Sequence, residues 1–160
     1  KVGLKNRADE NTKFLVLPMN KAGAKEVVSG EKMSCFLTLY KVKDFSEATD
    51  LAVKIQNYQG AGHSLGIHTQ SEERAHEIAM FAKTCRVIVN QAHCFATGGF
   101  FDNGLPFSLS MGCGSWGGNS IDGNLNWEHF VNKVRVVRTI EEDKPDLEDI
   151  FEDYWGETSK

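Results

Sequence analysis

The chain has 160 residues, of which 41% are hydrophobic and 25% charged, and this length and composition are typical of one globular domain. No apolar run approaches the roughly eighteen residues of a membrane-spanning helix, so the sequence predicts no membrane partner. The net charge is −4 and the basic residues are scattered rather than clustered, so the sequence predicts no nucleic-acid partner either.

Apolar runs rich in β-branched residues alternate with helical patterns along the chain. We predict strands at 34–42, 64–69 and 85–90, with a further candidate at 13–18. Between the first two lies a helical pattern that Asp44 or Ser46 can cap and that two glycines end, Gly60 and Gly62.

A second helix is predicted within residues 71–83. A capping box of Thr69 and Glu72 begins it. Its apolar face is expected at helical spacing, at Ala75, Ile78, Ala79 and Ala82.

The order of these elements predicts the α/β class. Strands and helices that alternate with short connections indicate a parallel β-α-β-α-β unit whose helices cover the sheet. Ligands of such sheets bind beyond the carboxyl ends of the strands. The third strand ends at Asn90, and residues 91–120 follow with little regular pattern but five aromatic side chains. Long loops of this kind are usually functional or disordered, and the aromatic content favours an ordered loop at a ligand site.

Two segments lie beyond the alternating unit. Residues 130–140 are β-rich, and we predict an edge strand that pairs either within the chain or with another subunit. Residues 141–160 hold nine acidic and two basic residues, so we predict a solvated acidic tail, a part of which docks through its apolar side chains.

The four cysteines show no pattern of a metal site or a disulfide framework. Cys35, Cys85, Cys94 and Cys113 form no C-x-x-C pair and no zinc-like spacing with histidine. We therefore predict no metal site and a cytoplasmic location. Cys94 lies next to His93, where an imidazolium can activate a thiol. Neighbouring side chains in an extended loop tend to point apart, however, so lining a substrate pocket competes with a nucleophilic role.

Four stretches resemble the CoA-acylating aldehyde dehydrogenases. They are residues 31–69, which begin EKMSCFLTLYKV, then CRVIVN, LSMGCGSWGGNS and VRVVRTI. The glycine-rich GCGSWGGNS is the most specific, and it is similar to the aldehyde dehydrogenase half of bifunctional aldehyde-alcohol dehydrogenases. The resemblance extends over about residues 13–140 in order, and the loop NQAHCFATGGFFDNGLPFSLSMGCGSWGG is closer to acylating sulfoacetaldehyde dehydrogenases.

The resemblance implies an oxidoreductase reaction. In this family a cysteine thiolate attacks an aldehyde, a hydride passes to NAD(P)+, and coenzyme A releases the thioacyl group as acyl-CoA. The family's nucleophile and dinucleotide-binding domain lie upstream of the segment matched here, so we expect no catalytic residue in this chain. We expect a fragment of a longer chain, or a split subunit with a companion chain that supplies both.

The resemblance also implies a domain organisation. Residues 1–129 correspond to the C-terminal part of the catalytic domain. Residues 130–140 correspond to a strand that extends a neighbouring subunit's sheet in a homo-oligomer. Residues 141–160 lie beyond the resemblance as the acidic tail.

By the same resemblance, Glu31 matches the carboxylate that binds the nicotinamide ribose, although it also fits a solvated glutamate, and Cys35 replaces a proline of the family. The residues expected to line the aldehyde pocket are His93, Phe95, Thr97, Gly98 and Cys113. Cys113 also fits a small buried residue in a tight turn. An anionic aldehyde would need cationic or multiple donor groups, and Arg86 begins a strand far from the end of the loop.

Two other functions stay open at this point. A non-catalytic module that keeps the fold for oligomerisation or scaffolding would be stable and have no affinity for NAD(P). An independent hydrolase or transferase would use Cys94 and His93.

Overall fold

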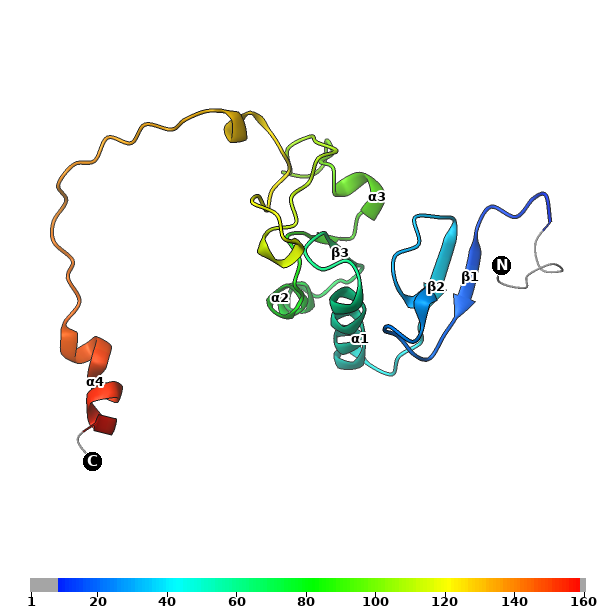
Figure 1. The fold of residues 1–160 in the computed structure, drawn as a ribbon, viewed down its shortest axis with the longest axis horizontal. Coiled ribbons are helices and arrows are strands. Elements are labelled where there is room, and N and C mark those ends of the chain that lie inside the picture. The colour runs from blue at the N-terminus through cyan, green and yellow to red at the C-terminus, as the bar shows by residue number, and fades with distance from the viewer. Residues whose placement is uncertain (1–8, 159–160) are drawn as a thin grey trace. The chain divides into compact units, whose positions relative to one another are not determined.

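The computed structural model describes residues 9–158 (Figure 1). The chain divides into two compact units, Lys1–Phe130 and Val131–Lys160, and each is described by itself. Within the described residues, no helix is both long and apolar enough to cross a membrane.

The first unit contains parallel strands in two separate pairs. β1 (Leu15–Pro18) pairs with β2 (Phe36–Leu39), and β3 (Leu65–Ile67) pairs with β4 (Val87–Val89). The predicted α/β class with parallel strands is confirmed, and the strands predicted at 13–18, 34–42, 64–69 and 85–90 are each present in shorter form.

The strand order differs from the prediction. β2 pairs with β1 and not with β3, so the alternating unit is divided between two two-stranded sheets among the described residues. Alternation along the chain indicates parallel strands, but it does not decide which strands become neighbours, because pairing depends on long-range contacts.

Both predicted helices form. α1 (Phe45–Tyr58) begins at Asp44, whose side chain accepts a hydrogen bond from the Glu47 N–H at 2.9 Å, and this decides between the two predicted caps. After the helix, Gly60 and Gly62 have φ values of 108° and 93°, which glycine adopts readily.

The helix α2 (Glu72–Phe81) has its N-cap two residues later than predicted. Ser71 is its cap and accepts from the Arg74 N–H at 3.3 Å, whereas the Thr69 hydroxyl accepts from the Ser71 N–H. The prediction of a capping box was wrong, because Thr69 is held at the end of β3 and does not cap the helix. The predicted apolar face is buried at Ala75, Ile78 and Ala82, whereas Ala79 is exposed.

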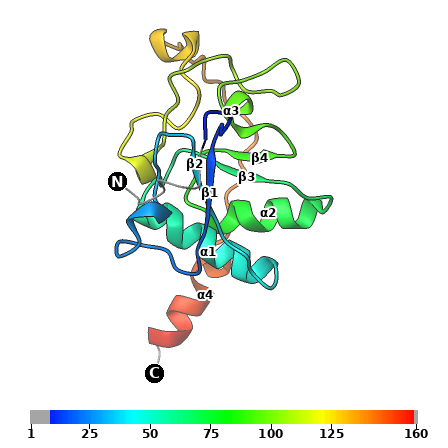
Figure 2. The same ribbon diagram turned by 90° about the vertical axis from the view of Figure 1, so that its right-hand side faces the viewer.

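The β3–β4 pair lies between helices and loop. In both views α1 and α2 lie on one side of this pair, and the long loop after β4 lies on the other (Figures 1 and 2). The loop has structure of its own: α3 (His93–Ala96) and the 3-10 turn Ser115–Gly117 interrupt it, and the turn Trp127–Phe130 follows it.

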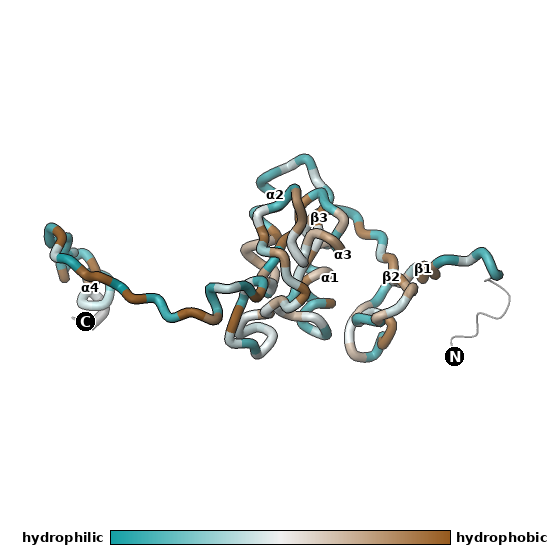
Figure 3. Tube along the Cα trace, turned by 90° about the horizontal axis from the view of Figure 1, so that it is seen from above, coloured by the Kyte–Doolittle hydropathy of each residue, from teal (hydrophilic) through white to brown (hydrophobic). Residues whose placement is uncertain are grey.

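The second unit contains an extended segment and one helix. Residues 131–146 form neither helix nor strand, so the strand predicted at 130–140 is not formed in the single chain. Apolar residues recur among polar ones over 131–140 (Figure 3), and Val134 and Val136 flank Arg135 as they would in a strand with one buried face. A strand exists only in a sheet, so this pattern needs a neighbouring strand. The acidic tail is helical in α4 (Leu147–Thr158), whose exposed apolar residues recur at helical spacing.

We expect Gly62→Ala to destabilise the protein more than Gly60→Ala does. Both positions have positive φ, so both substitutions carry a similar backbone strain of about 1 kcal/mol. A Cβ at Gly62 collides with the Cys113 carbonyl oxygen, whereas a Cβ at Gly60 meets no atom of residues 9–158 within 4 Å. Urea unfolding should show that the free energy of unfolding of the two variants differs by at least about 1 kcal/mol. Equal losses would mean that the glycine-rich turn does not pack against Gly62.

Candidate functional site

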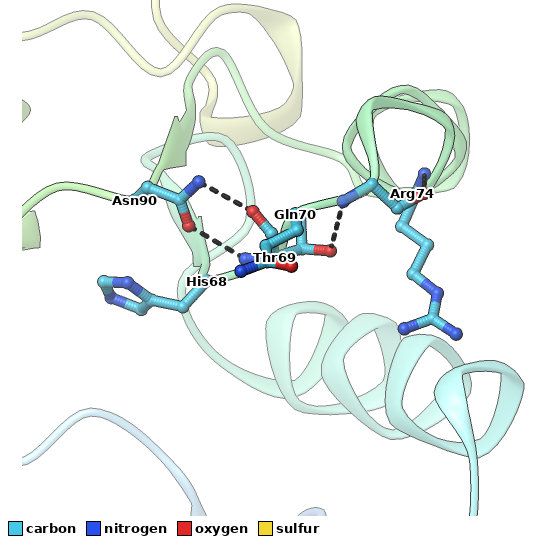
Figure 4. A pocket seen from close by; sticks show the side chains of 6 residues that line it. His68, Thr69, Gln70, Arg74 and Asn90 are labelled. Carbon is cyan, nitrogen blue, oxygen red and sulfur yellow. Dashed lines mark hydrogen bonds between the residues drawn. The ribbon is translucent and has the colours of Figure 1, made fainter.

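The Asn90 side chain joins the carboxyl ends of β3 and β4. Its Oδ1 accepts from the Thr69 N–H at 2.8 Å, and its Nδ2 donates to the Thr69 carbonyl at 2.7 Å (Figure 4). Asn90 has a φ of 55°, a conformation in which asparagine is enriched. The clamp therefore closes the strand pair and turns the chain into the long loop.

A pocket of about 920 Å³ lies beside this clamp, and no predicted site residue lines it. Figure 4 shows His68 and Arg74 at its opposite ends. The pocket is lined by His68, Thr69, Gln70, Ser71, Arg74 and Asn90.

Two predicted site residues share another pocket, which we name the Glu31 pocket. It has a volume of about 450 Å³, and both Glu31 and His93 line it. Its other lining residues come from the segment before Glu31, from α1 and from the approach to β3: Ser29, Gly30, Ile55, Gln56, Gln59, Gly60, His63 and Ser64. The fold thus brings together the residue predicted for the cofactor and one predicted for the substrate.

Gln56 is a buried residue of this pocket with unmet hydrogen-bonding capacity. It is 9% exposed, and within residues 9–158 neither its Nε2 nor its Oε1 has a hydrogen-bond partner. An unsatisfied buried amide costs about 1–3 kcal/mol and calls for an explanation, such as a role at a site. Sequence analysis missed Gln56 because it lies within the helical pattern of α1.

Three residues of the Glu31 pocket form a hydrogen-bonded group, which we name the histidine–serine row. The Ser64 Oγ lies 2.6 Å from Nδ1 of His63 and 2.8 Å from Nε2 of His93. Burial, and then the nearby His63, lower the pKa of His93 from its usual 6.5, so the neutral imidazole is favoured. The unfolded chain binds this proton more readily, so His93 disfavours folding as the pH falls below about 6.5.

The remaining loop residues of the prediction line a second pocket, which we name the loop pocket. It has a volume of about 500 Å³, and Phe95, Thr97 and Gly98 line it. Its apolar wall includes the Phe95 and Phe100 rings, whose centroids are 6.2 Å apart. Apolar walls with a few polar groups are typical of pockets for small organic ligands.

The cysteines of the loop lie in different surroundings. Cys94 lines the loop pocket, whereas its neighbour His93 lines the Glu31 pocket, which favours a lining role for Cys94 over a His93-activated nucleophile. Cys113 lines neither pocket, and its N–H donates to the Asn119 Oδ1 at 2.8 Å. Cys113 packs against Gly117. Its role in binding the substrate stays a prediction.

A buried polar centre that sequence analysis missed holds the loop on the strands. Arg86 is 5% and Asn124 2% exposed, and Nε of Arg86 donates to the Asn124 Oδ1 at 2.8 Å. Arg86 Nη1 also donates to the carbonyls of Gly112 at 2.9 Å and His63 at 3.1 Å. The expectation that Arg86 lies far from the end of the loop is therefore wrong, because the end of the loop folds back onto it and the carbonyls of Gly112 and Asp122 accept from its guanidinium.

Asn124 extends this centre to the start of the loop. Its Nδ2 donates to the carbonyls of Thr97 and Pro106, each at 2.9 Å. One asparagine thus satisfies the arginine and two loop carbonyls, and we name Arg86 with Asn124 the polar centre.

Among the described residues no group of three His, Cys, Asp or Glu side chains could hold a metal ion. All four cysteines are free thiols.

The comparisons with known proteins point to one class of enzyme. No protein-family model matches the chain. The chain is 46% identical over 147 residues to the acylating sulfoacetaldehyde dehydrogenase of Cupriavidus necator, which is 92% of this chain and 30% of that protein. It is 39% identical over 150 residues to the acetylating succinate-semialdehyde dehydrogenase of Clostridium kluyveri, covering 94% of this chain and 32% of that protein.

A solved structure agrees with these relatives. An acetylating aldehyde dehydrogenase from Geobacillus thermoglucosidasius matches with a TM-score of 0.75 and 31% identity, over 87% of this chain and 30% of that one. The resemblance inferred from the sequence is confirmed: this chain is homologous to a part of acylating aldehyde dehydrogenases. It spans about 30% of the length of the two relatives described above.

We expect Asn124→Ala to destabilise the protein by about 3 kcal/mol, because it leaves Nε of buried Arg86 and two loop carbonyls without a partner. Asn119→Ala is the matched control, since Asn119 is exposed, and it should cost about 1 kcal/mol or less. Urea unfolding measures both. Similar small losses for the two variants would show that the polar centre does not hold the loop.

Proposed function

We propose that this chain is part of an oxidoreductase that converts an aldehyde, NAD(P)+ and CoA to an acyl-CoA and NAD(P)H through a cysteine thioacyl intermediate. The observation that carries this proposal is the 46% identity to an acylating sulfoacetaldehyde dehydrogenase over 92% of the chain. The shared pocket of Glu31 and His93 supports it. The nucleophile and dinucleotide domain belong to polypeptide outside this chain, as part of the same protein or of a companion chain.

The substrate we propose is a small aldehyde with an anionic tail, and sulfoacetaldehyde is the first candidate. The two relatives described above are named for sulfoacetaldehyde and succinate semialdehyde, and each of these aldehydes carries an acid group. We place the aldehyde at the loop pocket and its border with the Glu31 pocket, with His93, Phe95, Thr97 and Gly98 lining it and Cys113 in the turn beyond.

The Glu31 pocket fits the ribose of a dinucleotide. A carboxylate accepts well from ribose hydroxyls, and a volume of about 450 Å³ accommodates a group of that size. The unpartnered Gln56 amide adds hydrogen-bonding capacity beside it. NAD(P)+ supplies the hydride acceptor when bound, and the role of Glu31 is to hold and orient it.

The histidine–serine row supplies a proton acceptor for acyl transfer. The thiolate of CoA is the attacking form, so its thiol must lose a proton. Nε2 of His63 has no hydrogen bond within the described residues, and the ring lines the Glu31 pocket. We place the thiol proton on this nitrogen, which makes His63 a catalytic residue where the sequence predicted none in this chain.

For the remaining segments, we propose that residues 130–140 form an edge strand on a second copy and that the protein acts in the cytoplasm. The four free thiols support a reducing location. The exposed β-rich residues Val134, Val136 and Val137 also suit the alternative function, a non-catalytic oligomerisation or scaffolding module.

The test uses the protein that contains this chain, purified with any companion polypeptide. Sulfoacetaldehyde and acetaldehyde are compared with NAD+ or NADP+, with and without CoA, and the CoA ester is identified by mass. We expect sustained NAD(P)H formation only with CoA, one CoA ester for each NAD(P)H, and a preference for sulfoacetaldehyde. Equal turnover without CoA would contradict acylation, and a folded protein that does not bind NAD(P) would favour the scaffolding module.

We expect Glu31→Gln to raise the KM for NAD(P)+ about tenfold, because an amide replaces a charged acceptor, a difference of about 1.4 kcal/mol. Glu77→Gln on the exposed face of α2 is the control and should change nothing. Steady-state kinetics at saturating CoA and aldehyde measure both. An unchanged KM for NAD(P)+ in Glu31→Gln would mean that Glu31 is a solvated surface residue and does not bind the cofactor.

A further inference from the structure

We propose that His93 is a positioning residue that acts through Ser64 on His63 and fixes which ring nitrogen of His63 carries a proton. The inference rests on the proposed acyl transfer to CoA. It adds to that function a second histidine and a glycine, Gly66, whose roles follow from the geometry of the histidine–serine row.

The hydroxyl of Ser64 constrains the two histidines. It has one proton to donate, yet ring nitrogens lie within hydrogen-bond distance on both sides, at 2.6 Å and 2.8 Å. At most one imidazole can therefore accept from Ser64, and a second ring that bonds to it must donate. When Ser64 donates to Nε2 of His93, Nδ1–H of His63 donates to Ser64, and Nε2 of His63 keeps its lone pair. When Ser64 donates instead to Nδ1 of His63, the proton of the neutral His63 ring is on Nε2. That nitrogen then cannot act as the base.

The surroundings of His93 suit the accepting role. Its lowered pKa, caused by burial and by nearby His63, keeps the ring neutral near pH 7. A neutral ring can accept the Ser64 hydrogen bond, but it does not offer the permanent charge that would bind a sulfonate. The charged groups around the row are Glu31, which lines the same pocket, and Arg86, whose Nη1 lies 3.1 Å from the His63 carbonyl.

Gly66 in β3 leaves space for the His93 ring. A Cβ at this position would lie 2.8 Å from Nδ1 of His93, a distance that real Cβ atoms essentially never show. The lack of a side chain at this strand position is therefore part of what places the ring beside Ser64. Displacing the ring by Gly66→Ala leaves every member of the row chemically intact.

The proton transfer is balanced without any change of oxidation state. The S–H bond of CoA breaks, and its proton passes to Nε2 of His63. The sulfur electron pair forms a bond to the thioacyl carbon, and the bond from that carbon to the enzyme sulfur breaks. The enzyme sulfur leaves as a thiolate.

The test separates acyl transfer from hydride transfer in the protein that contains this chain. A burst of NAD(P)H without CoA measures the hydride step, and the subsequent addition of CoA to the acylated protein measures thiolysis. His93→Leu removes the acceptor, His93→Gln keeps an acceptor oxygen, and Gly66→Ala displaces the ring. His68→Leu is the matched control, because His68 lines the separate pocket of Figure 4.

We expect His93→Leu to slow thiolysis about ten- to a hundredfold at pH 7, the range for loss of an orienting partner, with a much smaller loss in the hydride burst at saturating aldehyde. His93→Gln should retain most of the rate, and Gly66→Ala should fall between wild type and His93→Leu. The deficit should shrink above about pH 8.5, where an alkyl thiol ionises without a base. His68→Leu should behave as wild type.

Several outcomes would overturn the inference. One is a thiolysis rate of His93→Leu that equals that of His68→Leu. Another is a loss of thiolysis rate in His93→Leu that is the same at every pH. A third is a loss in the hydride burst of His93→Leu as large as its loss in thiolysis. A change confined to the KM for sulfoacetaldehyde relative to acetaldehyde would make His93 an aldehyde-binding residue instead. A wild-type protein that forms no CoA ester would contradict the proposed function itself, which is a separate result. If His93→Leu does not fold, Gly66→Ala and His93→Gln carry the same comparison.

Discussion

The hydrogen bond from Arg86 to Asn124 is the interaction on which the arrangement of this chain depends. A buried guanidinium is costly unless its donors are satisfied, and here the acceptors are an asparagine side chain and backbone carbonyls. These acceptors come from the loop and from the approach to β3. Satisfying one charge therefore holds together segments that are far apart in the sequence. Asn124 continues the network to the carbonyls at the start of the loop.

This constraint places the residues that we consider functional. Arg86 binds the carbonyl of His63, so the same centre that holds the loop also holds one end of the histidine–serine row. The other end, His93, lies in α3 just after Asn90 clamps the strand ends. Consecutive residues of α3 line different pockets, His93 the Glu31 pocket and Cys94 the loop pocket. Such an arrangement suits a reaction in which a cofactor, an aldehyde and a thiol must meet at one carbon.

Local patterns in the sequence were sufficient for β1 to β4, α1 and α2, but not for the strand partners or for the segment after residue 130. Helical spacing located α1, and the glycines after it mark its end. The pairing of β2 with β1 has no local signal, because the alternation of elements is the same for either neighbour. The position of Glu31 came from its family resemblance and that of His93 from the loop after the third strand. Their shared pocket appears only in the fold.

The polar centre and the histidine–serine row were not predicted from the sequence, for a similar physical reason. Most acceptors of Arg86 are backbone carbonyls, which every residue carries and which leave no mark in the sequence. Ser64 lies at an ordinary position before a strand, and only the parallel pairing of β3 with β4 brings His93 to it. An arginine directly before a wholly apolar strand was the one available signal, since a charge there has to be satisfied by a neighbouring segment.

Native-state hydrogen exchange of the unmodified protein tests the central claim most directly. The amides of Gly112 and Gly114 bond across the loop, and those of Leu65 and Asn90 bond between β3 and β4. If the polar centre joins loop and strands into one cooperative structure, all four amides should open with free energies within about 1 kcal/mol of one another. Loop amides that exchange a thousandfold faster than the strand amides would contradict the account, because the loop would then open without the strands.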